Sequence, residues 1–166
     1  MKRIALLPAV VFALSTGTGQ TSAPSDSALS ITGDVAIPVV LSLSDLMKLP
    51  HHVVRAVDHD NKEHAFDGVD VYRLLGAAGL RFADTLKGRA FASSVLIVRA
   101  LDGYQAAFSL AELDPTNTQQ QVVLAYKKDG KSLSDKEGKL RVIAGGDERH
   151  IRWVRQVKSF VVQRLN

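Results

Sequence analysis

The stretch "KLRVIAGGDERHIRWVRQVKSFVV", residues 139–162, holds the clearest structural pattern in the chain. Apolar and β-branched residues dominate its two ends, which is typical of strands, and we expect strands over residues 139–146 and 152–164. Between them, Gly145 and Gly146 allow a sharp turn and a close approach of the backbone to a ligand. The stretch therefore predicts two strands joined by a glycine-rich loop that forms one lip of a pocket.

The same part of the chain carries a local excess of positive charge. Residues 139–166 hold two acidic side chains, Asp147 and Glu148, against seven basic ones: Lys139, Arg141, Arg149, Arg152, Arg155, Lys158 and Arg164. Such a region suits a small anion or an acidic partner surface, whereas a solvated strand face is the alternative for each residue taken singly. The whole chain has a formal net charge of only +4, which does not indicate a nucleic-acid-binding protein.

Outward from this stretch, strand patterns alternate with short helical ones. Asp102–Gly103 predicts a hairpin turn, and the strand pattern of 119–133 runs into a second Asp-Gly turn at Asp129–Gly130. We expect extended segments at 29–42, 51–57, 93–101, 104–110 and 119–133, with 93–101 buried on both faces, and helices at 42–50, 69–79 and 109–115. Because short helices are inserted among strands without a regular βαβ order, we expect an α+β fold with mixed and antiparallel β sheets.

The first residues have the pattern of an export signal. Residues 1–23 begin with Lys2 and Arg3, continue with an apolar run too short to cross a bilayer as a helix, and end in small and polar residues. A cytosolic chain with a buried first helix is the alternative. We expect a Sec-type signal peptide at 1–23 and a single domain at 24–166 that does not itself span a membrane.

Cysteine is absent from the sequence. This excludes a cysteine nucleophile, a thiolate metal ligand and a disulfide. His59 and His64, with acidic residues near them, leave open a zinc or hydrated metal site, for which a solvated polar loop is the alternative.

Four segments, taken in order, resemble one known family. They are "ITGDVAIPVVLSLSDLMKLP", "FDGVDVYRLLGAAGL", "VRALDGYQAAFSLAEL" and "VLAYKKDGKSLSDKEGKLRVIAGGDERHIRWVRQV". Together they resemble the oxidoreductase molybdopterin-binding domain, the fold at the centre of sulfite oxidase, over nearly all of residues 30–163. The resemblance implies a sulfite oxidase-like fold and a pterin ligand.

One departure from the family bears on function. In the molybdenum enzymes of this family a cysteine after the early strand binds the metal, and Asp58 or His59 is nearest to that position here. A carboxylate or an imidazole would not reproduce the thiolate's electron donation. We therefore expect no sulfite oxidase reaction and no molybdenum.

Small exported proteins with this fold and without the cysteine imply a more specific function. They bind reduced pterins in the periplasm and, when loaded, dock on the periplasmic domain of a membrane-bound diguanylate cyclase or phosphodiesterase. The resemblance implies that this chain is a non-enzymatic periplasmic pterin sensor that regulates cyclic-di-GMP signalling. The alternative is a molybdopterin-dependent oxidoreductase subunit that lacks the usual cysteine ligand.

The expected pterin site combines acids, donors and aromatic walls, as a flat hydrogen-bonding heterocycle requires. Its residues are Asp102, Tyr104, Phe108, Arg141, Asp147, Arg149, His150, Arg152 and Trp153. Four of them have structural alternatives. Trp153 also fits a core position at strand alternation, Arg141 a structural ion pair, Tyr104 hairpin packing, and Asp102 the chemistry of a turn.

Overall fold

The structure is a computed structural model, and it describes residues 27–80, 82 and 89–165. The predicted signal peptide lies outside these residues. The elements are, in order, β1 (Ser27–Gly33), β2 (Val39–Ser42), α1 (Leu43–Lys48), β3 (His52–Val57), β4 (Glu63–Asp70), α2 (Val71–Ala77), α4 (Arg89–Ala92), β5 (Ser94–Ala100), β6 (Gln105–Ser109), α5 (Leu110–Leu113), β7 (Val122–Lys128), β8 (Lys131–Ser132), β9 (Arg141–Ala144), the 3₁₀ turn η1 (His150–Arg152) and β10 (Val157–Arg164). None of the helices described is long and apolar enough to cross a membrane.

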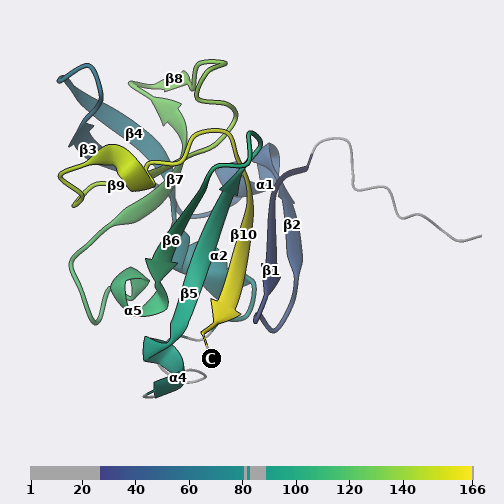
Figure 1. Cartoon of the computed structure of the whole chain (residues 1–166). Helices are drawn as coiled ribbons and strands as arrows, with labels where there is room; N and C mark the ends of the chain where they lie inside the picture. Colours follow the sequence, from purple (N-terminus) through teal and green to yellow (C-terminus); the bar gives the residue numbers. More distant parts are fainter. Residues whose placement is uncertain (1–26, 81, 83–88, 166) are drawn as a thin grey trace, which may run out of the picture.

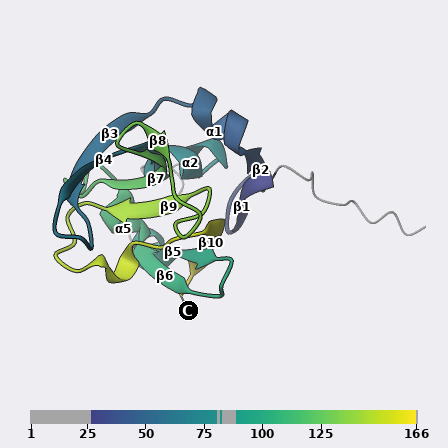
Figure 2. The same cartoon turned by 90° about the horizontal axis from the view of Figure 1, so that it is seen from above.

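The strands form two sheets, which Figures 1 and 2 show as separate layers. One sheet has the order β2-β1-β10-β5-β6, and the other has the order β3-β4-β7-β8 with β9 paired to β7. β1 and β10 run parallel, and the remaining pairs are antiparallel. The predicted α+β class with mixed and antiparallel sheets and short helices is confirmed.

The hydrophobic core lies between the two sheets. Phe160 and Leu96 reach it from the first sheet, Phe66 and Leu124 from the second, and Leu74 from α2; all five belong to one buried cluster. Burying a side chain of this size stabilises the fold by about 1.5–3 kcal/mol. The packing of the two sheets fixes the strand ends on which the site is built.

Capping boxes start α1 and α5 where the sequence predicts them. Ser42 accepts from the backbone N–H of Asp45, whose side chain accepts from the backbone of Ser42. Ser109 and Glu112 form the same reciprocal pair at α5. Such caps satisfy backbone donors that a helix leaves unpaired. The second box also places the Glu112 carboxylate beside the candidate site.

The predicted long strand at 152–164 is wrong at its start. β10 begins at Val157, and η1 and a bend precede it. Gln156 has a φ of 50°, which breaks the extended pattern. The indole N–H of Trp153 donates to the carbonyl oxygen of Ala144 at 2.9 Å, so a tertiary contact holds this segment against β9 in place of strand pairing.

Two other local predictions need correction. β4 begins at Glu63, in the region of His59 and His64 for which the sequence left a solvated polar loop open, because pairing with β3 extends it. β5 is not buried on both faces: Leu96 and Val98 are buried, whereas Arg99 is exposed.

Candidate functional site

The candidate site is built around a buried ion pair between Asp58 and Arg141. Asp58 follows β3, and Arg141 begins β9. The Arg141 guanidinium donates to both oxygens of Asp58, Nη2 to Oδ1 at 2.7 Å and Nη1 to Oδ2 at 2.9 Å. Lys128 Nζ donates to Oδ2 at 2.6 Å. Burial raises the pKa of Asp58, but the hydrogen bonds from Arg141 and Lys128 outweigh it and hold that pKa well below its usual value.

Arg141 is enclosed on all sides. It is fully buried, its Nη1 donates to Glu137 Oε1 at 2.6 Å, and its guanidinium carbon lies 5.5 Å from the Phe66 ring centre and 5.3 Å from that of Trp153. Its Nε has no hydrogen-bond partner among the residues described. The structural ion pair considered for Arg141 is therefore present.

The donor atoms near Asp58 do not fit a metal bound by the protein. Both carboxylate oxygens of Asp58 are held by cations. Within 27–80, 82 and 89–165, no group of three or more potential metal-ligating side chains is close enough to hold an ion. The possible metal site at His64 also lacks a free ring nitrogen, because the two nitrogens contact Asp129 at 2.6 Å and Asp60 at 3.0 Å.

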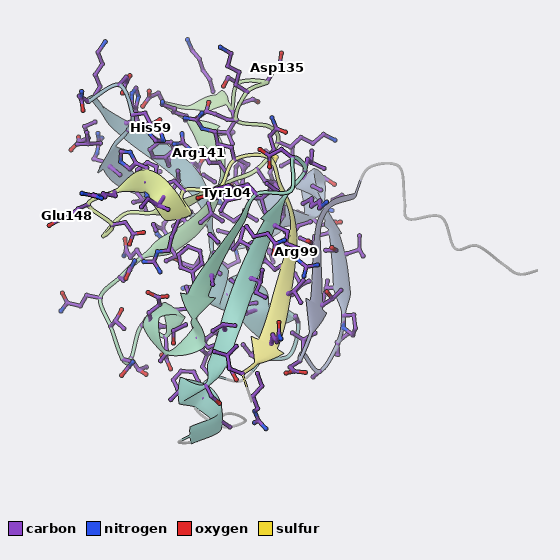
Figure 3. All side chains as sticks on the ribbon, in the orientation of Figure 1. His59, Arg99, Tyr104, Asp135, Arg141 and Glu148 are labelled. Atoms are coloured by element: carbon purple, nitrogen blue, oxygen red, sulfur yellow. The ribbon has the colours of Figure 1, made fainter. Side chains whose placement is uncertain are left out.

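Three aromatic rings lie edge-on or tilted to one another next to the ion pair. The rings of His59 and His150 are 4.5 Å apart between centres, and those of His150 and Trp153 are 4.2 Å apart. Burial lowers the pKa of His59, as do the positive charges of His150 and Arg155. Figure 3 shows His59, Arg141 and Tyr104 toward the same end of the molecule.

A small pocket of about 180 Å³ opens beside these rings. It is lined by Asp102, Tyr104, His150, Ile151, Trp153 and Arg155. The structure thus brings together four of the predicted pterin residues and adds Ile151 and Arg155. The sequence could have indicated Arg155 through its place among the basic residues of 139–166, but it was assigned to the expected strand at 152–164. No local pattern marks Ile151.

Two polar contacts shape this pocket. The Tyr104 hydroxyl donates to the carbonyl oxygen of Ile151 at 2.6 Å, which joins the β5–β6 turn to η1. Asp102 accepts from the backbone N–H of Tyr104 at 2.9 Å, so the turn chemistry considered for Asp102 is present.

The other predicted residues form a neighbouring cluster. Arg152 donates to Asp147 at 2.6 and 2.8 Å and to both oxygens of Glu112 at 3.0 Å. The hydrogen bonds that Arg152 donates to Asp147, and next those that it donates to Glu112, raise the pKa of Arg152 against the effect of burial. Phe108 is fully buried 4.5 Å beneath the Arg152 guanidinium, so it lies in the core and not on a pocket wall. Arg149 is exposed at the start of η1.

The sequence model of the "Oxidoreductase molybdopterin binding domain" matches residues 17–164. The chain belongs to this family. The sulfane dehydrogenase SoxCD from Paracoccus pantotrophus is similar in structure to this molybdopterin-binding domain, with a TM-score of 0.64 and 19% sequence identity. The match covers 82% of this chain and 38% of that one, so the chain spans well under half of that protein. A search of curated proteins finds no match.

These comparisons confirm the family and its sulfite oxidase-like fold and correct one expectation. The sequence led us to expect a protein that is not an enzyme, and that expectation is wrong, because the family is an oxidoreductase domain family. The pterin ligand is supported in its general form, since the domain is one that binds molybdopterin. The expected absence of molybdenum is not confirmed.

In this molybdopterin-binding domain the pterin and the metal place different demands on the site. Asp102 can accept from ring N–H groups, His150 and Arg155 can donate, and Trp153 offers an aromatic wall beside them. The residues present therefore fit the pterin, whereas Asp58 does not fit as a ligand of the metal.

Proposed function

We propose that the chain is an oxidoreductase domain that binds molybdopterin through the pterin, without a bond from the protein to the metal. The observation that carries this proposal is the Asp58–Arg141 pair. Asp58 or His59 is nearest to the position where the family resemblance expects the cysteine, and both oxygens of Asp58 are held by buried or half-buried cations. The Asp58 carboxylate here serves as a counter-ion for cations, whereas the family's cysteine is a ligand of the metal.

The roles of the surrounding residues follow from their positions. Asp102 accepts hydrogen bonds from the pterin, and His150 and Arg155 donate to its oxygen atoms. Trp153, held in place by its bond to Ala144, forms the wall on which the ring lies. The SoxCD likeness supports an oxidoreductase role for the fold.

The test is the cofactor content of the protein purified without oxygen from its own cells. Molybdenum is measured by mass spectrometry of the metal, and the pterin by its fluorescence after oxidation. We expect stoichiometric pterin and molybdenum in the native protein, and loss of both in His150→Ala. The control is Lys158→Ala, an exposed β10 variant that should keep both. A native protein with neither pterin nor molybdenum would overturn the proposal.

A second candidate function is signalling by the loaded domain. Two exposed apolar residues line the small pocket, Tyr104 at 46% and Ile151 at 63%, and Leu101, at 67%, directly precedes the lining residue Asp102 in the chain. Exposed apolar groups gathered at one place favour contact with a partner. We propose that the domain, loaded with a reduced pterin, docks here on the periplasmic domain of a membrane-bound diguanylate cyclase or phosphodiesterase.

Docking is tested by calorimetry with the purified periplasmic domain of such an enzyme. Binding that requires a reduced pterin and is lost in Ile151→Asp would support this role. Equal binding by the Ile151→Asp variant, or no binding with the pterin present, would refute it.

Export to the periplasm is part of both candidates. Residues 1–23 have the order of a signal peptide. Cell fractionation and sequencing of the mature N-terminus test this: a periplasmic protein that begins near residue 24 agrees with it, and an uncut cytosolic protein does not.

A further inference from the structure

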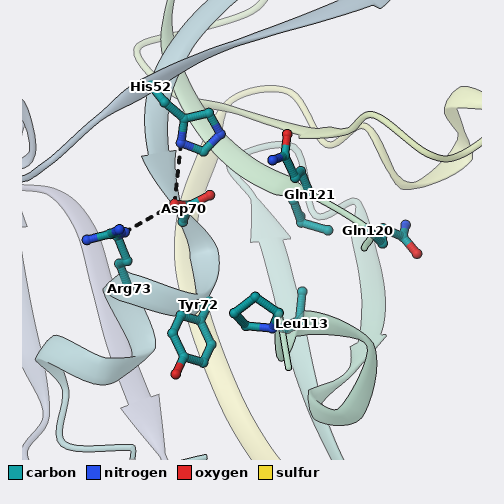
Figure 4. Close-up of a pocket in the computed structure, with 9 residues that line it drawn as sticks. His52, Asp70, Tyr72, Arg73, Leu113, Gln120 and Gln121 are labelled. Carbon is teal, nitrogen blue, oxygen red and sulfur yellow. Dashed lines mark hydrogen bonds and ion pairs between the residues drawn. The ribbon is translucent and has the colours of Figure 1, made fainter. Parts of the chain in front are cut away.

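A second cavity is lined by other residues than those predicted to bind the pterin. Its volume is about 630 Å³, and it is bordered by the starts of β3, α2 and β7 and by the segment after α5 (Figure 4). Small-molecule sites have volumes of about 300–1,000 Å³, and this cavity falls within that range. None of the residues that the sequence analysis assigned to the pterin lines this cavity.

One wall of the cavity presents two hydrogen-bond acceptors side by side. Nδ1 of His52 lies 3.3 Å from Oδ2 of Asp70. In the neutral imidazole with its proton on Nδ1, the nitrogen that faces the carboxylate, Nε2 is an acceptor. Nε2 is shielded from solvent and has no partner among the residues described. In Figure 4 it points toward the side of Gln121, and the second oxygen of Asp70 points into the cavity.

The charge of this wall is balanced. Arg73 Nε donates to Oδ2 of Asp70 at 3.2 Å, and Arg73 also lines the cavity, on the side of Asp70 opposite Gln121 in Figure 4. The carboxylate therefore already has its counter-ion. A neutral ligand with N–H donors suits this wall better than a free anion, which Asp70 would repel.

The remaining walls suit a flat ring. Tyr72, Leu113 and Pro115 provide apolar surface, and Gln120 and Gln121 provide amide groups on the side opposite Asp70. The Gln120 amide nitrogen is held by Asp147 Oδ1 at 3.0 Å, so its position is set before a ligand arrives. Apolar surfaces with a few convergent polar groups are the usual composition of a heterocycle site.

We propose that this cavity binds a neutral flat heterocycle through a 2-amino-4-oxopyrimidine edge, the chemistry shared by guanine and pterins. The exocyclic amine and the adjacent ring N–H donate to Asp70 and His52, and the glutamine amides face the carbonyl side of the ring. The site is separate from the one in the proposed function and does not rest on it.

The test is calorimetric titration of the whole chain with guanosine and with inosine. Inosine differs from guanosine by lacking the 2-amino group. We expect guanosine to bind in the micromolar range and inosine to bind about tenfold more weakly or worse, since one hydrogen bond to a charged acceptor is lost. Titration with 6-hydroxymethylpterin distinguishes the two natural sources of this edge.

Two variants assign the binding to this cavity. Asp70→Asn keeps the shape of the side chain but replaces an acceptor with a donor, and it should weaken binding of the preferred ligand about tenfold. Asp135→Asn is the matched control: it makes the same change at an exposed site and should bind as the native chain does. Denaturant unfolding of both variants verifies that they are folded.

The outcomes are distinct. Binding of guanosine or of the pterin that is weakened in Asp70→Asn supports the site and names the source. The proposal would be overturned if guanosine and inosine bound equally and the affinity for the pterin were unchanged in Asp70→Asn. It would also be overturned if neither guanosine nor the pterin bound at about 1 mM.

Discussion

Arg141 and Asp58 are joined by two hydrogen bonds, of 2.7 and 2.9 Å, although 83 positions separate them in the sequence. Arg141 is fully buried and Asp58 nearly so. Removing two charges from water is costly, and the cost is recovered only when each charge has its partners. The pair therefore joins the start of β9 to the end of β3. Each of the two charges is stabilised in the interior only while the other is present.

Asp58→Ala should be strongly destabilising. The substitution leaves Arg141 buried with only Glu137 as a counter-ion, and loss of one partner of a buried pair costs about 3–5 kcal/mol. Urea unfolding measures the loss. The control is Arg55→Ala, which removes the exposed ion pair with Glu63 and should cost at most about 1 kcal/mol. Equal small losses in the two variants would show that the buried pair contributes no more than a surface one.

The same pair predicts how stability changes in acid. Hydrogen bonds hold the pKa of Asp58 below its unfolded value of 3.8, so the folded state binds fewer protons than the unfolded state there. The contribution of Asp58 is fully present above this value and is lost progressively as the pH falls below it. The free energy of unfolding, measured between about pH 6 and pH 2, should fall more steeply for the native chain than for Asp58→Ala. Parallel curves would contradict this.

His64 has the opposite sign of pH dependence. The hydrogen bond to Asp129, and next that to Asp60, raises the pKa of His64 above its ordinary value of 6.5. Its contribution is fully present below the ordinary value and is lost as the pH rises through the higher folded pKa. His64→Gln should therefore lower the Tm at about pH 5 and have less effect at about pH 9. A Tm difference that is the same at both would show that the histidine acts by packing alone.

Gly33→Ala should disrupt the junction of β1 and β10. A Cβ at this position would lie 2.0 Å from the carbonyl oxygen of Val162, and Gly33 has a φ of 91°. Gly130 also has a positive φ, of 75°, but a Cβ there would meet open space. We expect Gly130→Ala to cost about 1–2 kcal/mol, the cost of the left-handed conformation, and Gly33→Ala to cost clearly more. Similar unfolding free energies for the two variants would mean that β1 and β10 move apart to accommodate the added Cβ without loss of stability.

The sequence by itself determined the elements that depend on neighbouring residues. Ser42 and Ser109 begin helices because a cap requires only residues within one turn. Asp129 and Gly130, both with positive φ, turn the chain between β7 and β8 as an Asp-Gly pair predicts. The ordered motifs also sufficed to identify the family, because strand alternation and turn residues are local signals.

Only the tertiary structure decided how the site is assembled. Trp153 continues an alternating pattern, yet its indole bond to Ala144 holds it outside the strand. Phe108 has the chemistry of a pocket wall but lies beneath Arg152, whose partners come from α5 and the glycine-rich loop. The partner of Asp58 could not be read from the residues around it. The order of the strands β3, β4, β7 and β9 in the sheet, and not local preference, selects which buried charges meet.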